Sequence, residues 1–274
     1  MTEKALFSPG AVVAPAIDWL NRHAHGVFNA ISIAVEASLD LVEAVLLVLP
    51  APAMAAAIVA LVLWRQGVRM AMLAAGCLAV AGLSGLWEAT MQTVALVTTS
   101  VIIAVAIAFP LGILAARRPK LEAAMRPVLD LMQTVPPWVY LIPAVMIFSL
   151  GKVPAMLATV IYGIPPMLRI TTLAFRQVPR ELVELGAASG ATPFQTLTKI
   201  EIPSARKTLL LGLNQCILLS LAMVVLAGLV GAGGLGAEVT RGLTRMEMGL
   251  GLRSGLAIVA VAIFLDRISR RALE

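Results

Sequence analysis

Long apolar stretches separated by short polar or basic segments make up most of this chain. A helix needs about 20 predominantly apolar residues to cross a bilayer, and about seven stretches approach or exceed that length. They cover residues 45–64, 70–88, 91–116, 128–150, 153–175, 207–231 and 248–267. The pattern therefore predicts an all-α, polytopic membrane protein with about seven transmembrane helices.

Residues 1–44 are more polar, and we predict that they form an extracytoplasmic or interfacial segment. Within them, Glu36, Asp40 and Glu43 are spaced to share one face of an otherwise apolar helix. This pattern favours a helix along the membrane surface, and a crossing by residues 28–44 stays open. We accordingly predict two N-terminal transmembrane helices over 45–88 and a core over 89–270.

Composition and charge agree with a membrane protein. Hydrophobic residues make up 60% and charged residues 13% of the chain, whereas soluble domains carry about 25% charged residues. The net charge of +6 could suggest nucleic-acid binding, but 15 of the 21 basic residues fall in the segments that would share one side. The positive-inside rule then predicts an inner-membrane protein with its N-terminus outside and its C-terminus cytoplasmic, and no nucleic-acid partner.

The longest basic loop contains signals for two short helices. Pro179 suits a first helical turn, and Gly190 can adopt the left-handed conformation that ends a helix. Thr192 is a candidate N-cap with Pro193 at the next position, and Pro203 opens the following span. We predict two short helices that meet at Gly190, with an ordinary solvated loop as the alternative.

The same loop carries a family resemblance. Glu184-Leu-Gly-Ala-Ala-Ser-Gly190, followed by Pro203, resembles the EAA loop of ABC importer permeases, whose pattern is E-A-A-x-x-x-G. Leu185 and Gly186 depart from the two alanines. In that family the loop forms a coupling helix that docks in a groove of a cytoplasmic ATPase. The resemblance implies this role for residues 176–203, with the following coupling residues: Glu184, Gly186, Ala187, Gly190, Pro193 and Pro203.

Further motifs between about residues 90 and 270 resemble the permeases of glycine betaine, proline betaine and choline importers. They are Leu129–Pro143, Ile164–Ile170, Gly212–Gln215, Val230–Gly236 and Leu265–Arg267. The resemblance implies a type I ABC importer permease fold and alternating access. It also implies a second permease copy, cytoplasmic ABC ATPase subunits and an extracytoplasmic binding protein, besides contact with membrane lipid.

The chain lacks the features of an enzyme. It has no G-x-x-x-x-G-K-[ST] phosphate loop, so a partner must hydrolyse ATP, and we expect no cofactor and no metal site. Gly231, Gly233 and Gly236 satisfy G-x-G-x-x-G, but they follow an apolar helix and not the strand that a dinucleotide site requires. We predict that they end the sixth span and form a flexible external turn.

Two other functions are weighed against this one. An intramembrane enzyme or ATPase-independent channel would need a catalytic dyad or an acidic ring within the spans, and the sequence offers neither. A permease for another amine or amino-acid-like solute stays open. The sequence does not choose between choline, glycine betaine and proline betaine, nor between osmoprotection and catabolism.

Polar and aromatic residues within the spans are candidates for the translocation path, because polar groups in a bilayer are costly and often functional. Helix–helix hydrogen bonding is an equal alternative for the polar ones. Aromatic faces can hold a quaternary ammonium, although selectivity can also reside in the binding protein. The candidates are Gln133, Thr134, Trp138, Tyr140, Asn214, Gln215 and Ser220.

Overall fold

The computed structural model describes residues 9–271, and every regular element in this range is helical. The elements are α1 (Pro9–Leu47), α2 (Ala51–Gln66), α3 (Val68–Leu83), α4 (Trp87–Arg117), α5 (Pro119–Thr134), α6 (Pro137–Phe148), α7 (Lys152–Arg176), α8 (Arg180–Ala188), α9 (Pro193–Thr196), the π-helix η1 (Leu197–Glu201), α10 (Ile202–Ala222), α11 (Val224–Leu229), α12 (Gly234–Thr244) and α13 (Met248–Arg271).

Four helical stretches within residues 9–271 are long and apolar enough to cross a membrane. They are α4, α7, α13 and the stretch Pro193–Leu229, which contains α10. Two bent pairs would raise the number to six: Arg22–Leu47 with α2, bent by 93°, and α5 with α6, bent by 91°. The all-α membrane fold is therefore confirmed, with four to six candidate spans.

The difference from about seven spans has local causes. The span expected over 128–150 is interrupted at Pro136 and Pro137, because proline lacks the amide hydrogen that continues a helix. The span expected over 70–88 is the 16-residue helix α3, which ends at Leu83. At 1.5 Å per residue, a helix of this length is shorter than the hydrocarbon core of a bilayer, about 30 Å.

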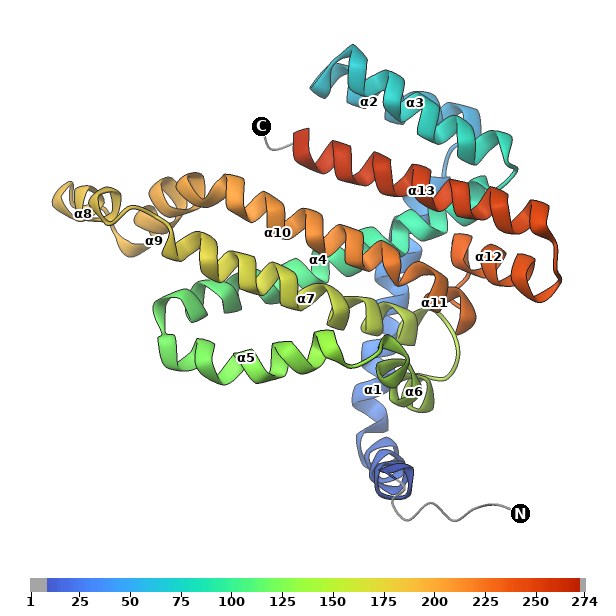
Figure 1. The fold of residues 1–274 in the computed structure, drawn as a ribbon, viewed down its shortest axis with the longest axis horizontal. Helices are drawn as coiled ribbons and strands as arrows, with labels where there is room; N and C mark the ends of the chain where they lie inside the picture. The colour runs from blue at the N-terminus through green and yellow to red at the C-terminus, as the bar shows by residue number, and fades with distance from the viewer. Residues whose placement is uncertain (1–8, 272–274) are drawn as a thin grey trace.

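Helix α7 lies at the centre of the bundle and packs against α4 and α10 (Figure 1). Small residues allow these close approaches. A Cβ atom on Gly112 of α4 would lie 2.6 Å from Cβ of Thr171, and one on Gly212 of α10 would lie 3.2 Å from Cβ of Ile170. Membrane helices associate through such van der Waals packing, because lipid tails are as apolar as the side chains.

Helix α1 runs across the direction of α7 and α10 (Figure 1). Its acidic face meets the start of α7, where Nζ of Lys152 donates to Oδ1 of Asp40 at 3.0 Å and to Oε2 of Glu43 at 2.9 Å. The crosswise direction suits an interfacial helix. The division of the chain at residue 44 stays a prediction, and residues 1–8 lie outside the described residues.

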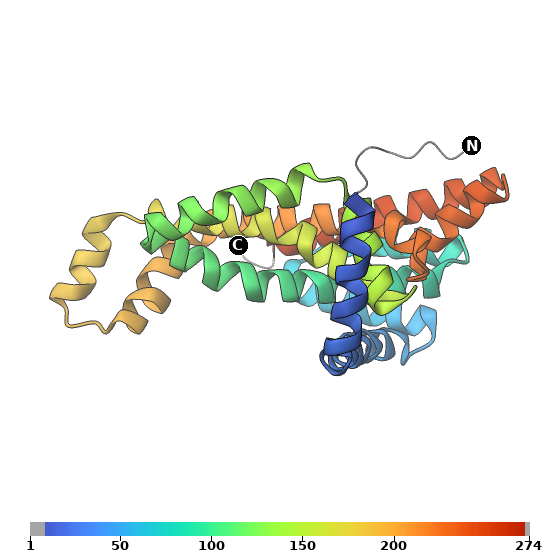
Figure 2. The ribbon, with the colours of Figure 1, turned by 90° about the horizontal axis from the view of Figure 1, so that it is seen from below.

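The two ends of the long axis differ. At one end, α8 and α9 extend beyond the bundle (Figure 2), and at the other lie α12 and the turn into α13 (Figure 1). The C-terminal end of α4 lies at the α8 end. The basic loops that flank α4 and α8 therefore gather at one end of the molecule.

Candidate functional site

The loop after α7 forms the projecting helical hairpin that the sequence predicts. Pro179 directly precedes α8, and the helix ends where Gly190 adopts φ +75°. The amide of Ala191 donates to the carbonyl of Gly186 at 2.9 Å, which satisfies one of the last free carbonyls of α8. The predicted left-handed glycine is confirmed.

The second arm of the hairpin begins with a reciprocal capping box. The amide of Gln195 donates to Oγ1 of Thr192 at 3.3 Å, and the amide of Thr192 donates to Oε1 of Gln195 at 2.9 Å. Pro193 occupies the first turn of α9, as predicted, and Pro203 occupies that of α10. Between them, η1 is a five-residue π-helix, a feature found frequently at functional sites.

Gly186 lies where the two arms of the hairpin meet. A Cβ atom at this position would lie 2.6 Å from Cδ1 of Ile200 in η1. The glycine that replaces the second alanine of the EAA pattern therefore lets α8 and η1 pack closely. Helix α8 contacts mainly α9 and η1, so these contacts determine its position.

The hairpin presents apolar side chains to solvent. The exposed fractions are 40% for Leu182, 62% for Leu185 and 73% for Phe194, and Glu184 and Ala187 beside them are also exposed. Apolar side chains exposed together on a projecting segment are typical of a protein interaction site. We call these five residues the hairpin surface.

One ion pair connects the hairpin to the bundle. Nη2 of Arg117, at the end of α4, lies 2.7 Å from Oε2 of Glu201 at the end of η1. Since η1 continues directly into α10, the hairpin is connected to both α4 and α10.

The break between α5 and α6 brings several predicted path residues to the surface. Val135 and Pro136 adopt extended conformations there, and Oη of Tyr140 donates across the break to the carbonyl of Leu131 at 2.8 Å. Trp138 is 47% exposed. Helices broken at membrane depth occur where they face protein or a cavity.

Both polar candidates at the end of α5 are exposed. Gln133 and Thr134 are exposed at the end of α5, although Oγ1 of Thr134 also donates to the carbonyl of Asp130 at 2.9 Å. Because their side chains are exposed, Gln133 and Thr134 are available to a passing solute or a second chain.

The three candidates on α10 occupy different environments. Asn214 is 3% exposed, and its Oδ1 accepts from Oγ of Ser269 in α13 at 2.6 Å, which fits the helix–helix interpretation. Ser220 is 1% exposed and lies beside Gly163 of α7, inside the bundle. Gln215 is exposed on the outer face of α10. Within this chain, Gln215 alone of the three faces outward.

A charged cavity between α5 and α7 was not predicted from the sequence. It has a volume of about 430 Å³. Glu122 pairs with Arg126 at 2.9 Å and with Arg176, and Asp130 pairs with Arg169. The spacing of Glu122 and Arg126 by four residues indicates a pair on one helix, whereas the pairs between helices depend on packing that spacing does not reveal.

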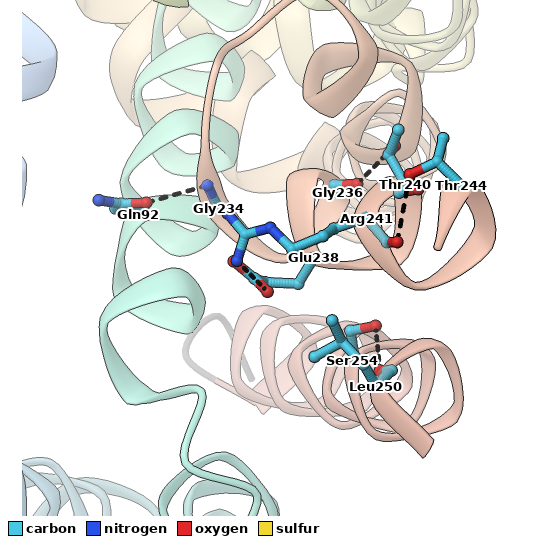
Figure 3. Close-up of polar contacts among 9 residues, drawn as sticks. All are labelled: Gln92, Gly234, Gly236, Glu238, Thr240, Arg241, Thr244, Leu250 and Ser254. Atoms are coloured by element: carbon cyan, nitrogen blue, oxygen red, sulfur yellow. Dashed lines mark hydrogen bonds and ion pairs between the residues drawn. The ribbon is translucent and has the colours of Figure 1, made fainter. Parts of the chain in front are cut away.

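The glycine-rich segment before α12 forms a tightly packed reversal. Oε1 of Gln92 in α4 accepts from the amide of Gly234 at 2.9 Å, as Figure 3 shows. Oγ1 of Thr93 accepts from the amide of Leu235, also at 2.9 Å. A Cβ atom on Gly236 would lie 1.9 Å from the carbonyl oxygen of Val224.

The segment follows the end of the sixth span, as predicted. The expectation of a flexible turn is wrong, because the segment is hydrogen-bonded and closely packed. Gly231, Gly233 and Gly234 have φ of +85°, +79° and +68°, values that side chains rarely adopt. These glycines provide the positive φ that the reversal needs, and Gly236 provides close backbone contact. The sequence did not predict the role of Gln92 and Thr93. Two polar residues in an apolar helix do not indicate which distant backbone amides they bind.

Comparison with protein families identifies the chain. Residues 108–271 match the family described as "Binding-protein-dependent transport system inner membrane component". The match covers the C-terminal part of α4 and every element from α5 to α13, including the hairpin. The chain belongs to this family. It is a multi-pass transport permease of the inner membrane.

Several relatives of the permease carry functional names. The glycine betaine/proline betaine transport system permease protein ProW of Escherichia coli (strain K12) is 40% identical over 268 residues, which are 97% of this chain and 75% of ProW. The glycine betaine transport system permease protein OpuAB of Bacillus subtilis (strain 168) is 40% identical over 93% of this chain and 90% of its own. The glycine betaine/carnitine transport permease protein GbuB of Listeria monocytogenes is 48% identical over 67% of this chain and 65% of GbuB.

A solved structure supports the fold of the permease. The MetNI methionine ABC transporter in an inward-facing conformation matches with a TM-score of 0.56 and 24% identity, covering 69% of this chain and 96% of that chain. The type I ABC importer permease fold predicted from the sequence is confirmed.

Proposed function

We propose that this permease is the membrane subunit of an ATP-driven importer of quaternary amines, with glycine betaine as the first candidate substrate and choline as the second. The names of ProW, OpuAB and GbuB support a betaine substrate. The hairpin surface is the observation that supports ATP-driven transport, because it places apolar side chains where a cytoplasmic ATPase can bind them.

The proposed complex contains two copies of this chain, two ABC ATPase subunits and an extracytoplasmic binding protein. ATP binds the ATPases, and this chain itself holds no cofactor. The hairpin end is cytoplasmic, so the C-terminal end of α13 is cytoplasmic as well. We further propose that the N-terminus is outside, which requires an odd number of crossings. The basic loops at the hairpin end support this orientation through the positive-inside rule.

Alternating access follows from the connections of the hairpin. ATP binding brings the two ATPases together and moves the two hairpins. The ion pair of Arg117 with Glu201 and the continuous path from η1 into α10 transmit that movement to α4 and α10. The spans then rock outward to receive the solute, and hydrolysis with product release resets them.

The translocation path lies between the two permease copies. Side chains that face outward from one copy are therefore its best candidates: Gln133, Thr134, Trp138 and Gln215 are exposed. Exposed aromatic faces can contact a quaternary ammonium without a hydrogen bond. Tyr140 supports this surface from the other side of the helix break.

Uptake of labelled solutes tests the proposal. The host lacks its own betaine and choline importers and expresses this chain with its neighbouring ATPase and binding protein. We expect uptake of glycine betaine that is lost when the ATPase carries an inactivated phosphate loop. An assembled complex that takes up neither glycine betaine nor choline would contradict the substrate class, and uptake without ATPase activity would contradict ATP-driven transport.

A further inference from the structure

A basic groove separates the N-terminal end of α3 from the C-terminal end of α13. It has a volume of about 670 Å³. Four arginines line it together with one acidic residue, Asp266. The arginines are Arg69 from α3 and Arg267, Arg270 and Arg271 from α13. Two helices far apart in sequence thus bring an excess of positive charge to one place.

The arginines differ in their protein partners. Nε of Arg270 donates to Oδ1 of Asp266 at 2.9 Å, and Nη1 of Arg271 donates to the carbonyl of Gln66 at 3.3 Å. Within residues 9–271, Arg69 and Arg267 form no ion pair. The groove therefore retains guanidinium groups that can bind an external anion.

The remaining lining of the groove is apolar. Met70 and Leu73 of α3 and Ile263 of α13 continue it away from the arginines, toward the middle of both helices. The ligand that matches this lining has an anionic head and a hydrocarbon chain. A free phosphate would leave the apolar part without a partner.

The depth of the groove agrees with the level of lipid headgroups. Trp64, at the end of α2, is exposed, and the guanidinium carbon of Arg65 lies 5.5 Å from the centroid of its ring. Exposed tryptophans at helix ends mark the membrane–water interface. Gln66 belongs to the same helix end and donates from Nε2 to the carbonyl of Ile268, which connects this level to the groove.

We propose that this groove binds one anionic phospholipid, with its phosphate at Arg69 and Arg267 and an acyl chain along Met70, Leu73 and Ile263. Basic pockets between membrane helices on the cytoplasmic side bind such headgroups. The cytoplasmic assignment rests on the proposed function, since it follows from the orientation of the hairpin.

Native mass spectrometry of the purified transport complex tests this site, with phosphatidylglycerol and phosphatidylcholine added in parallel titrations. The variant Arg69→Gln/Arg267→Gln removes the two charges. The matched control Arg245→Gln/Arg253→Gln removes two arginines at the opposite end of the molecule. A third variant, Arg69→Lys/Arg267→Lys, keeps the charge and shows whether the altered positions still allow folding.

The first variant should bind phosphatidylglycerol about 30-fold more weakly, which is about five- to sixfold for each of the two interfacial charges that it removes. Its affinity for phosphatidylcholine should be unchanged, and the control and lysine variants should retain the preference for phosphatidylglycerol. Equal losses in the first variant and the control would overturn the proposal. So would displacement of phosphatidylglycerol by millimolar inorganic phosphate, which would indicate a site for a free anion. Because the readout is lipid binding, it is independent of whether the complex transports betaine.

Discussion

Replacement of Gly190 by valine tests how the hairpin is shaped. Gly190 has φ +75°, and a Cβ atom built there meets no atom within 4 Å. Added bulk therefore finds open space, and the whole effect of the substitution must come from the backbone conformation. Gly190→Val separates strain from steric collision at this turn.

The expected magnitude follows from the left-handed conformation. A residue with a Cβ atom costs about 1–2 kcal/mol in that region, and a β-branched residue is a strong outlier there. A cost of this size lowers the ratio of the native turn to its alternative conformations by a factor of roughly 5–30. Because α9 begins only a few residues later, the hairpin surface would lose its shape while the spans remain folded.

The assay compares binding-protein-stimulated ATP hydrolysis and uptake in membrane vesicles. Gly190→Val should insert normally and lose most of both activities. Gly76→Val is the matched control, because Gly76 is exposed within α3 and its Cβ atom also meets nothing within 4 Å, but its φ is not positive. Full coupling in Gly190→Val, at normal expression, would refute the argument from backbone strain.

Three other substitutions test separate parts of the structure. Gly236→Ala should destabilise the complex by roughly 1–3 kcal/mol through overpacking against Val224. Its melting temperature should be lower than that of the control Gly251→Ala, whose added Cβ atom meets nothing within 4 Å. Equal melting temperatures would contradict the close packing. Lys152→Gln should lower the melting temperature at low salt, and the difference should shrink at about 1 M salt, where charges are screened within about 3 Å; a difference independent of salt would exclude the ion pairs as its cause. Trp138→Ala should raise the KM of uptake about two- to fivefold through loss of a cation–π contact worth about 0.5–1 kcal/mol, and unchanged uptake in a fully assembled complex would remove Trp138 from the path.

Local signals in the sequence predict the hairpin well. Pro179, Gly190, Thr192 and Pro193 each restrict the backbone through their own chemistry, so helix ends follow from neighbouring residues alone. The structure places Gly190, Thr192 and Pro193 as predicted, whereas Pro179 directly precedes the first turn of α8. The docking of this hairpin on an ATPase is a proposal that depends on a second protein.

Contacts between distant segments were not predicted. Gln92 binds an amide 142 residues away, and Lys152 pairs with acids on α1 more than 100 residues away. Hydrophobic periodicity locates a helix but does not give its rotation or its neighbour. For the same reason the sequence did not predict that Gln215 is exposed while its neighbour Asn214, on the same helix, is buried.

Copurification tests the central claim, that the hairpin surface binds the cytoplasmic ABC ATPase. The variant Leu185→Ala/Phe194→Ala removes the most exposed apolar side chains of the hairpin, and Leu243→Ala/Met248→Ala removes similarly exposed ones at the opposite end. We predict that the ATPase copurifies with the wild-type chain and with the second variant, and is lost from the first. Recovery of the ATPase with the first variant at the wild-type level would contradict the account.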